Sequence, residues 1–320
     1  MSVAAPISVR NLRIGLDLGG TKIQRTVLDP GGGERLRARV PTPASDYDGT
    51  VRALAELVAE ADARLGATAP VGVAIPGTVS RATGLVRNAN STCLIGRPLD
   101  RDLAEAIGRP VRLANDANCF VLSEAVDGAA RGYGVVFGVI VGTGCGGGLV
   151  VNGAVVTGAH GIAGEWGHNP LPWPAADETP GPACYCGLRG CVETFLSGPG
   201  MARDHREGTG LDLKASSIAA AAEAGGADAL ATLARYQNRM ARALASVINV
   251  LDPDIIVLGG GVSNIKQLYE TVPHQWLAYV FSDQCETPLV AAAHGDASGV
   301  RGAARLWPVA DENTLSNRNP

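Results

Sequence analysis

Apolar residues in the first third of the chain fall into short runs bounded by glycine, proline, asparagine and aspartate. Such runs are typical of buried strands. They predict strands at Arg13–Leu18, Ile23–Leu28, about Glu34–Val40, Val71–Ile75 and Val111–Ala114. A glycine turn joins the first two strands into a hairpin, and Asn115-Asp116 ends the last one. Polar and glycine residues therefore gather at predicted strand ends.

A helix is predicted between the third and fourth strands, beginning near Thr50 and stopping at Gly66. Its apolar positions follow a 3.6-residue period: Val51, Leu54, Leu57, Val58, Ala61 and Leu65.

The second half repeats this order of elements. A strand is predicted at Val135–Val141, a glycine loop at GTGCGGG (142–148), and a hairpin over Leu149–Val156 that turns at Asn152-Gly153. A long helix at about Arg235–Leu251 precedes a strand at Asp254–Leu258, which runs into Gly259-Gly260-Gly261. The two halves are predicted to be duplicates of one α/β pattern.

Three glycine loops thus follow predicted strands. Glycine lets backbone amides approach a phosphate closely, and clustered amides supply partial positive charge. A lone glycine after a strand is usually only a turn. Three such loops together predict a nucleotide-binding cleft.

Composition narrows the classes of partner. The 320 residues suggest two domains, and 46% hydrophobic residues suffice for packed cores. A net charge of −4 without runs of lysine or arginine offers no basic surface for nucleic acid or membrane, so a small-molecule partner is expected. No charged residue lies between Arg131 and Glu165, but the glycines there favour strands and turns over a membrane span. The N-terminus does not resemble a secretory signal, and a cytoplasmic protein is expected.

Several motifs resemble those of the ROK family of sugar kinases and repressors: GLDLGGTK (15–22), LANDAN (113–118), GTGCGGG, GEWGH (164–168), CYCGLRGC (184–191) and VLGGG (257–261). The resemblance implies the two-lobed fold of actin and hexokinase, a ribonuclease H-like ATPase fold, with ATP and sugar between the lobes. The small lobe would span residues 1–115, completed by a C-terminal helix at about 300–320, and the large lobe 116–299. NANSTCLIGRPLDRDL and GEWGHNPLPWP resemble bacterial ROK fructokinases most.

The resemblance assigns the catalytic base to Asp116, which would accept the proton of a hexose 6-hydroxyl. A helix cap is the structural alternative for Asn115-Asp116, because both residue types favour that position. Asn118 is left open between a role at the site and a structural one. ATP would contact residues of three loops, and Asp17 would reach Mg²⁺ through water or be purely structural. The expected ATP-binding residues are Asp17, Gly19, Gly20, Thr21, Lys22, Gly142, Thr143, Gly144, Gly259, Gly260 and Gly261.

Sugar hydroxyls are bound by planar polar groups at fixed angles, such as those of Asn and Glu. The motifs assign this role to Gly77, Asn90, Asn115, Glu165, His168 and Glu193. Each alone would more often be a solvated surface residue. Cys93 stands where the family usually has an aromatic residue, which bears on the choice of sugar.

Three cysteines and one histidine form the composition of a closed structural zinc site: His168, Cys184, Cys186 and Cys191. Such a zinc would pin together the loops that carry Glu165 and Glu193. Free thiols around a core histidine are the alternative. The other cysteines, Cys93, Cys119, Cys145 and Cys285, have the character of buried or strand-end thiols.

The predicted function is ATP-dependent phosphorylation of a hexose, fructose first, then mannose or glucose, then an N-acetylhexosamine. A ROK repressor is the main alternative, but about a dozen residues precede the first strand, too few for a DNA-binding domain. A chaperone-like or cytoskeletal ATPase would leave the cysteine cluster unexplained. The resemblance also implies a homodimer.

Overall fold

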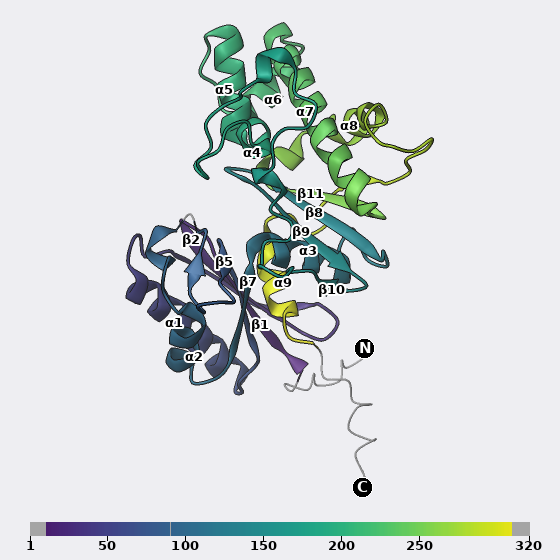
Figure 1. The fold of residues 1–320 in the computed structure, drawn as a ribbon. Helices are drawn as coiled ribbons and strands as arrows, with labels where there is room; N and C mark the ends of the chain where they lie inside the picture. The colour runs from purple at the N-terminus through teal and green to yellow at the C-terminus, as the bar shows by residue number, and fades with distance from the viewer. Residues whose placement is uncertain (1–10, 90, 309–320) are drawn as a thin grey trace. The chain divides into compact units, whose positions relative to one another are not determined.

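The computed structural model describes residues 11–89 and 91–308, which form two compact units (Figure 1). The first unit holds the described residues up to Ser123, together with Gly158–Ile162 and the described residues from Ala297 on. The second holds Glu124–Thr157 and Ala163–Asp296. The division predicted from the sequence, with a large lobe over residues 116–299, differs from this one over residues 116–123, 158–162 and 297–299.

The first unit is built on a five-stranded sheet of order β3-β2-β1-β4-β7. The first three strands are antiparallel neighbours, whereas β4 and β7 run parallel to β1. Their bounds are β1 Arg13–Leu18, β2 Lys22–Leu28, β3 Glu34–Pro41, β4 Val71–Ile75 and β7 Val111–Asn115. All five strands were predicted to within about a residue at each end, because nearly every apolar position in β1, β2 and β4 is buried.

Side chains alternate across this sheet, and each face has its own helices. Ile14 and Leu16 lie in the core shared with α1 (Tyr47–Leu65) and α2 (Leu99–Ile107). The other face carries α9 (Ser298–Arg305), where Gly15 and Gly72 pair across β1 and β4. A Cβ on either glycine would lie about 2 Å from a backbone carbonyl oxygen of α9. Two neighbouring glycines therefore allow α9 to pack directly on the sheet.

The predicted helix at about 300–320 overlaps α9 at its start, and residues 309–320 lie outside the described part of the chain. The helix predicted from Thr50 is α1, which begins earlier, at Tyr47, and is capped by Asp46. The helix stops at Gly66, as predicted, and this glycine has the left-handed conformation (φ 66°).

The second unit repeats the same sheet, with order β10-β9-β8-β11-β12. An antiparallel hairpin, β8 and β9, is again followed by parallel strands on the other side of its first strand. The bounds are β8 Val135–Val141, β9 Cys145–Val151, β10 Ala154–Val155, β11 Ile255–Gly259 and β12 Leu289–Ala291. The predicted duplication is confirmed. The loop predicted at 142–148 is wrong in length, however, because Cys145–Gly148 pair with β8 as the start of β9.

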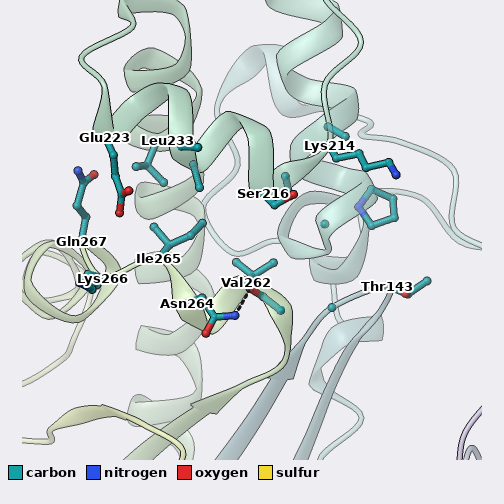
Figure 2. Close-up of a pocket in the computed structure, with 18 residues that line it drawn as sticks. Thr143, Lys214, Ser216, Glu223, Leu233, Val262, Asn264, Ile265, Lys266 and Gln267 are labelled. Carbon is teal, nitrogen blue, oxygen red and sulfur yellow. Dashed lines mark hydrogen bonds between the residues drawn. The ribbon is translucent and has the colours of Figure 1, made fainter. Parts of the chain in front are cut away.

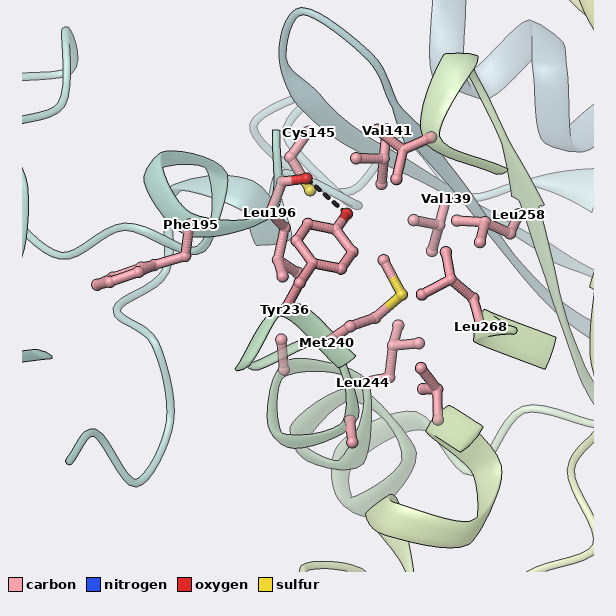
Figure 3. Packing of buried hydrophobic residues seen from close by; sticks show 14 of the residues in the cluster. Val139, Val141, Cys145, Phe195, Leu196, Tyr236, Met240, Leu244, Leu258 and Leu268 are labelled. Carbon is pink, nitrogen blue, oxygen red and sulfur yellow. Dashed lines mark hydrogen bonds between the residues drawn. The ribbon is translucent and has the colours of Figure 1, made fainter. Parts of the chain in front are cut away.

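Helix α7 (Ala227–Leu251) forms the centre of the second core (Figure 3). Its residues Tyr236, Met240 and Leu244 face the strand residues Val139 and Val141. The Tyr236 hydroxyl donates to the carbonyl of Leu196 at 2.7 Å, so the one polar group of this ring is satisfied. The remaining helices of this unit are α4 Val192–Leu196, α5 Gly198–Thr209, α6 Ala215–Glu223 and α8 Leu268–Trp276, while α3 (Asp116–Asp127) begins in the first unit.

The charge-free run from 131 to 165 forms the hairpin strands β8 to β10, as predicted. Within residues 11–89 and 91–308, none of the helices combines the length and apolar character that a bilayer span requires.

Candidate functional site

The polar end of β7 supplies the first group of candidate residues. Asn115 is the last residue of β7, and its side-chain oxygen accepts hydrogen bonds from the backbone N–H groups of Ala117 (2.9 Å) and Asn118 (3.4 Å). Its amide nitrogen donates to the Gly77 carbonyl at 3.2 Å. Asn115 therefore caps α3 and ties it to the turn after β4, so the capping interpretation holds for this residue.

Gly77 has φ of +93°, and a Cβ there would lie 2.5 Å from the Arg87 carbonyl oxygen. Only glycine fits this turn without strain. Asn90 lies outside the described residues. Cys93 is half-buried and packs against the core of the first unit.

Two carboxylates lie close together in the first unit. Asp116 begins α3 and accepts a hydrogen bond from the N–H of Ala117 at 2.8 Å. Burial, then the charge on Asp116, raises the pKa of Asp17 from 3.8 to about 6, against the opposing effect of Lys22. Oxygen ligands of this kind suit Mg²⁺, whose charge would relieve the repulsion between the two groups.

The predicted phosphate loops occupy equivalent places in the two sheets. Gly19, Gly20 and Thr21 connect β1 to β2, and the Gly19 N–H donates to the Lys22 carbonyl at 3.0 Å. Gly142–Gly144 connect β8 to β9, and the Gly142 N–H donates to the Gly144 carbonyl at 2.9 Å. Each loop is a tight hairpin turn at one end of its sheet.

A cavity of about 570 Å³ lies in the second unit beside the second of these turns (Figure 2). Of the predicted ATP-binding residues, Gly142, Thr143 and Gly261 line it. Gly259 and Gly260 do not, but Gly260 has φ of +83° and lies against β8, where a Cβ would come 2.3 Å from the Val141 carbonyl oxygen. The turn after β11 therefore requires glycine for packing.

Most of the other residues that line this cavity were not predicted from the sequence. They come from α5, α6 and its N-cap, α7 and the segment after β11, and include Lys214, Ser216, Glu223, Leu233, Val262, Asn264, Ile265 and Gln267. No element was predicted between residues 198 and 223. Pro199 in the first turn of α5 and the alanine-rich run of α6 are helix signals that could have located both helices.

The remaining sugar-binding candidates, Glu165, His168 and Glu193, all lie in the second unit. Glu165 directly precedes the 3₁₀ turn Trp166–His168, and Glu193 lies in α4. A carboxylate oxygen of Glu193 accepts a hydrogen bond from the Cys145 N–H at 2.9 Å. A Cβ on Gly144 would come 2.7 Å from that oxygen, so the glycine turn and Glu193 fit each other.

The predicted metal ligands are brought together. One ligand atom from each of His168, Cys184, Cys186 and Cys191 lies within 4.8 Å of all the others. The Cys184 sulfur is 3.6 Å from Nδ1 of His168, and the sulfurs of Cys186 and Cys191 are 3.6 Å apart. Tetrahedral zinc with Zn–S bonds of about 2.3 Å places its ligands roughly 3.7 Å apart. The four residues therefore fit a closed zinc site, and His168 would ligate through Nδ1.

The other ring nitrogen of His168, Nε2, lies 3.0 Å from the Tyr185 hydroxyl. Outside the cluster, burial raises the pKa of the Cys119 and Cys145 thiols far above the usual range. These two cysteines are therefore unreactive core residues.

Comparison with known proteins is consistent with these features. The model of the ROK family matches residues 13–310. An N-acetyl-D-glucosamine kinase of Pectobacterium atrosepticum is 42% identical over 296 residues, covering 91% of this chain and 97% of that protein. The ROK hexokinase of Thermus thermophilus has the same fold (TM-score 0.81, 34% identity), and the match covers 92% of this chain and 96% of that one. A ROK family glucokinase from Streptomyces griseus, solved with glucose and AMPPNP, matches with a TM-score of 0.75 and 28% identity over 92% of this chain and 98% of its own. The two duplicated sheets are thus those of the actin-like ATPase fold, and the chain belongs to the ROK family.

Proposed function

We propose that this protein is an ATP-dependent sugar kinase that phosphorylates the 6-hydroxyl of N-acetyl-D-glucosamine. The observation that carries the proposal is the 42% identity, over nearly the full length of both chains, to a protein named as a kinase of that sugar. The prediction of fructose as first substrate is not supported by this relative. The N-acetylhexosamine, ranked last from the sequence, therefore becomes the leading substrate.

Asp116 is the proposed base, because its carboxylate begins α3 at the polar end of β7. Phosphoryl transfer requires the enzyme mainly to position the reactants and balance charge, and a carboxylate is a sufficient proton acceptor. Asn115 would hold this carboxylate in place through the helix cap. The side chain of Asn115 is already hydrogen-bonded to the protein at both its oxygen and its nitrogen. A sugar hydroxyl bound by Asn115 would have to share these two atoms.

The nucleotide is assigned to the glycine turns and the 570 Å³ cavity. The apolar wall of Leu233, Val262 and Ile265 suits a base, and Gly142 and Thr143 suit phosphates. Asp17 would hold Mg²⁺, which neutralises phosphate charge when bound. Glu165 and Glu193 would accept hydrogen bonds from sugar hydroxyls, while zinc on the cysteine cluster would hold their two segments together without taking part in the chemistry.

A coupled ADP-release assay tests the proposal with N-acetylglucosamine, N-acetylmannosamine, glucose, mannose and fructose at saturating MgATP. We expect the highest kcat/KM for N-acetylglucosamine, with phosphate at the 6-position of the isolated product. A higher kcat/KM for fructose would restore the original prediction. Absence of sugar-dependent ADP release with all five sugars would reject the kinase assignment.

A further inference from the structure

Tyr185 is an exposed aromatic residue in the middle of the cysteine cluster, between Cys184 and Cys186. Its surface is 82% exposed, yet the ring is fixed against His168. The two rings meet edge to face with centroids 5.1 Å apart, and the hydroxyl lies 3.0 Å from Nε2 of His168. An exposed tyrosine held in this way is available to a ligand.

Tyr185 also lies beside the carboxylates assigned to the sugar. It lines a second cavity of about 500 Å³, together with Glu193 and Thr143. Glu165 directly precedes the 3₁₀ turn that carries His168, the residue against which the Tyr185 ring lies. The ring, His168 and the two glutamates therefore share one region of the second unit.

The hydrogen bonds around His168 decide whether the Tyr185 hydroxyl donates or accepts. Nδ1 of His168 faces the Cys184 sulfur at 3.6 Å, so in the metal-binding tautomer Nε2 carries the hydrogen and donates to the Tyr185 oxygen. The phenol then uses its O–H as a donor toward a ligand. When ionised, Glu165 and Glu193 can only accept hydrogen bonds. Tyr185 therefore adds a donor beside these two acceptors.

This donor distinguishes between classes of sugar. A sugar hydroxyl can donate to the glutamates as well as accept, so it is satisfied with or without Tyr185. The carbonyl oxygen of an acetamido group can only accept, so it depends on a donor that ionised glutamates cannot supply, and its methyl group packs on an aromatic ring. We infer that Tyr185 is a specificity-determining residue whose hydroxyl donates to the acetamido carbonyl of an N-acetylhexosamine. The inference rests on the proposed function, and it names a residue that would select the N-acetylated sugar.

The test is Tyr185→Phe, which removes the hydroxyl and keeps the ring. Binding constants from titration calorimetry and kcat/KM are compared for N-acetylglucosamine and glucose. Loss of one neutral hydrogen bond is expected to weaken N-acetylglucosamine about 3- to 10-fold. The values for glucose are expected to change less than about 2-fold. Tyr185→Ala, which also removes the ring, is expected to lower the ratio of kcat/KM for N-acetylglucosamine to kcat/KM for glucose further.

The exposed Tyr133, outside the cluster, provides the matched control: Tyr133→Phe should leave both sugars unchanged. Zinc content is measured for every variant. Parallel weakening of both sugars by Tyr185→Phe, with or without loss of zinc, would make Tyr185 a structural part of the loop and overturn the inference.

The two proposals fail separately. A wild-type protein that does not phosphorylate N-acetylglucosamine rejects the proposed function. In that case the ratio of the two sugars' binding constants still decides on Tyr185, because an unchanged ratio in Tyr185→Phe rejects its role as a donor.

Discussion

Asp116 and Asn115 are neighbours with separable roles. Asn115 already provides the cap of α3, with its oxygen 2.9 Å from the N–H of Ala117. Replacing Asp116 by Asn should therefore preserve the fold but remove the proton acceptor. We expect kcat for the preferred sugar to fall by about 10²-fold or more, with little change in Tm. Steady-state kinetics and thermal denaturation measure the two effects, and near-normal turnover would contradict the base assignment.

Asn115→Ala is the contrasting variant. Loss of a side-chain cap costs about 1 kcal/mol, which lowers Tm by about 1.5 °C in a chain of 320 residues that unfolds as a whole. The hydrogen bond to the Gly77 carbonyl is lost as well. A variant with unchanged Tm would mean that Asn115 is not the structural cap that its contacts indicate.

Asp17 gives a prediction about pH. Its pKa rises from 3.8 to about 6 in the folded protein, so the folded state binds this proton more tightly than the unfolded state. Stability from this group is present below pH 3.8 and is lost as pH rises toward about 6. Asp17→Asn should therefore have a higher Tm than wild type at pH 7.5 without nucleotide or Mg²⁺, and the difference should shrink as pH falls through 6 to 4.

The control for Asp17 is Glu56→Gln, on the exposed surface of α1. Its Tm should follow wild type at every pH. A difference between Asp17→Asn and wild type that does not depend on pH would argue against the raised pKa. The same variant should lose most of its kinase activity if Asp17 holds Mg²⁺.

At the scale of elements, the segment between His168 and Cys191 contains little regular structure, and zinc on its ligand cluster is expected to stabilise it. Glu193 follows Cys191 by two residues, so the position of its carboxylate depends on that segment. Cys191→Ser is expected to lose zinc, to lower Tm and to raise KM for the sugar more than KM for ATP. Elemental analysis and kinetics check this, with Cys285→Ser, a half-buried thiol outside the cluster, as control. Zinc-free wild-type protein with full activity would contradict the site.

Elements with strong apolar periodicity were predicted well from the sequence, and those shaped by packing were not. Strands β4 and β8 match their predictions because nearly all of their residues are apolar and most are buried. The glycines of β9 were assigned to a loop, but Gly147 is needed because a Cβ would come 2.7 Å from Trp166. Only tertiary structure reveals that contact. Helix α7 begins at Ala227, eight residues before the predicted start at Arg235. The prediction missed its first turns because they consist mainly of small residues that give no clear apolar period.

The candidate site shows the same division. The cysteine cluster and the two glycine turns were found because their residue types and spacing carry the chemistry. Lys214, Ser216 and Gln267 were not found, because the cavity proposed for the nucleotide takes much of its wall from helices and helix ends whose residues have no distinctive spacing. Tyr185 was overlooked within its motif because the flanking cysteines gave the stronger signal.

At the scale of the whole molecule, the duplicated sheets give each unit its own half of the proposed machinery. The first unit holds Asp17 and Asp116, and the second holds Thr143 and Glu193. A reaction that needs both halves requires the units to act together. The predicted homodimer is a separate question, which light scattering would answer.

We expect the protein to become more compact when sugar binds, since excluding water from a kinase site prevents ATP hydrolysis. The chain passes between the units inside α3, on both sides of Gly158–Ile162 and before Ala297, so hinge residues should lie at these places. Small-angle scattering should show a smaller radius of gyration with N-acetylglucosamine than without it. A hexitol at the same concentration controls for solvent contrast and should cause no change. An unchanged radius under saturating sugar would mean that water is excluded by side chains and loops alone, and sugar-independent ATP hydrolysis should then be insensitive to substitutions at the hinge positions.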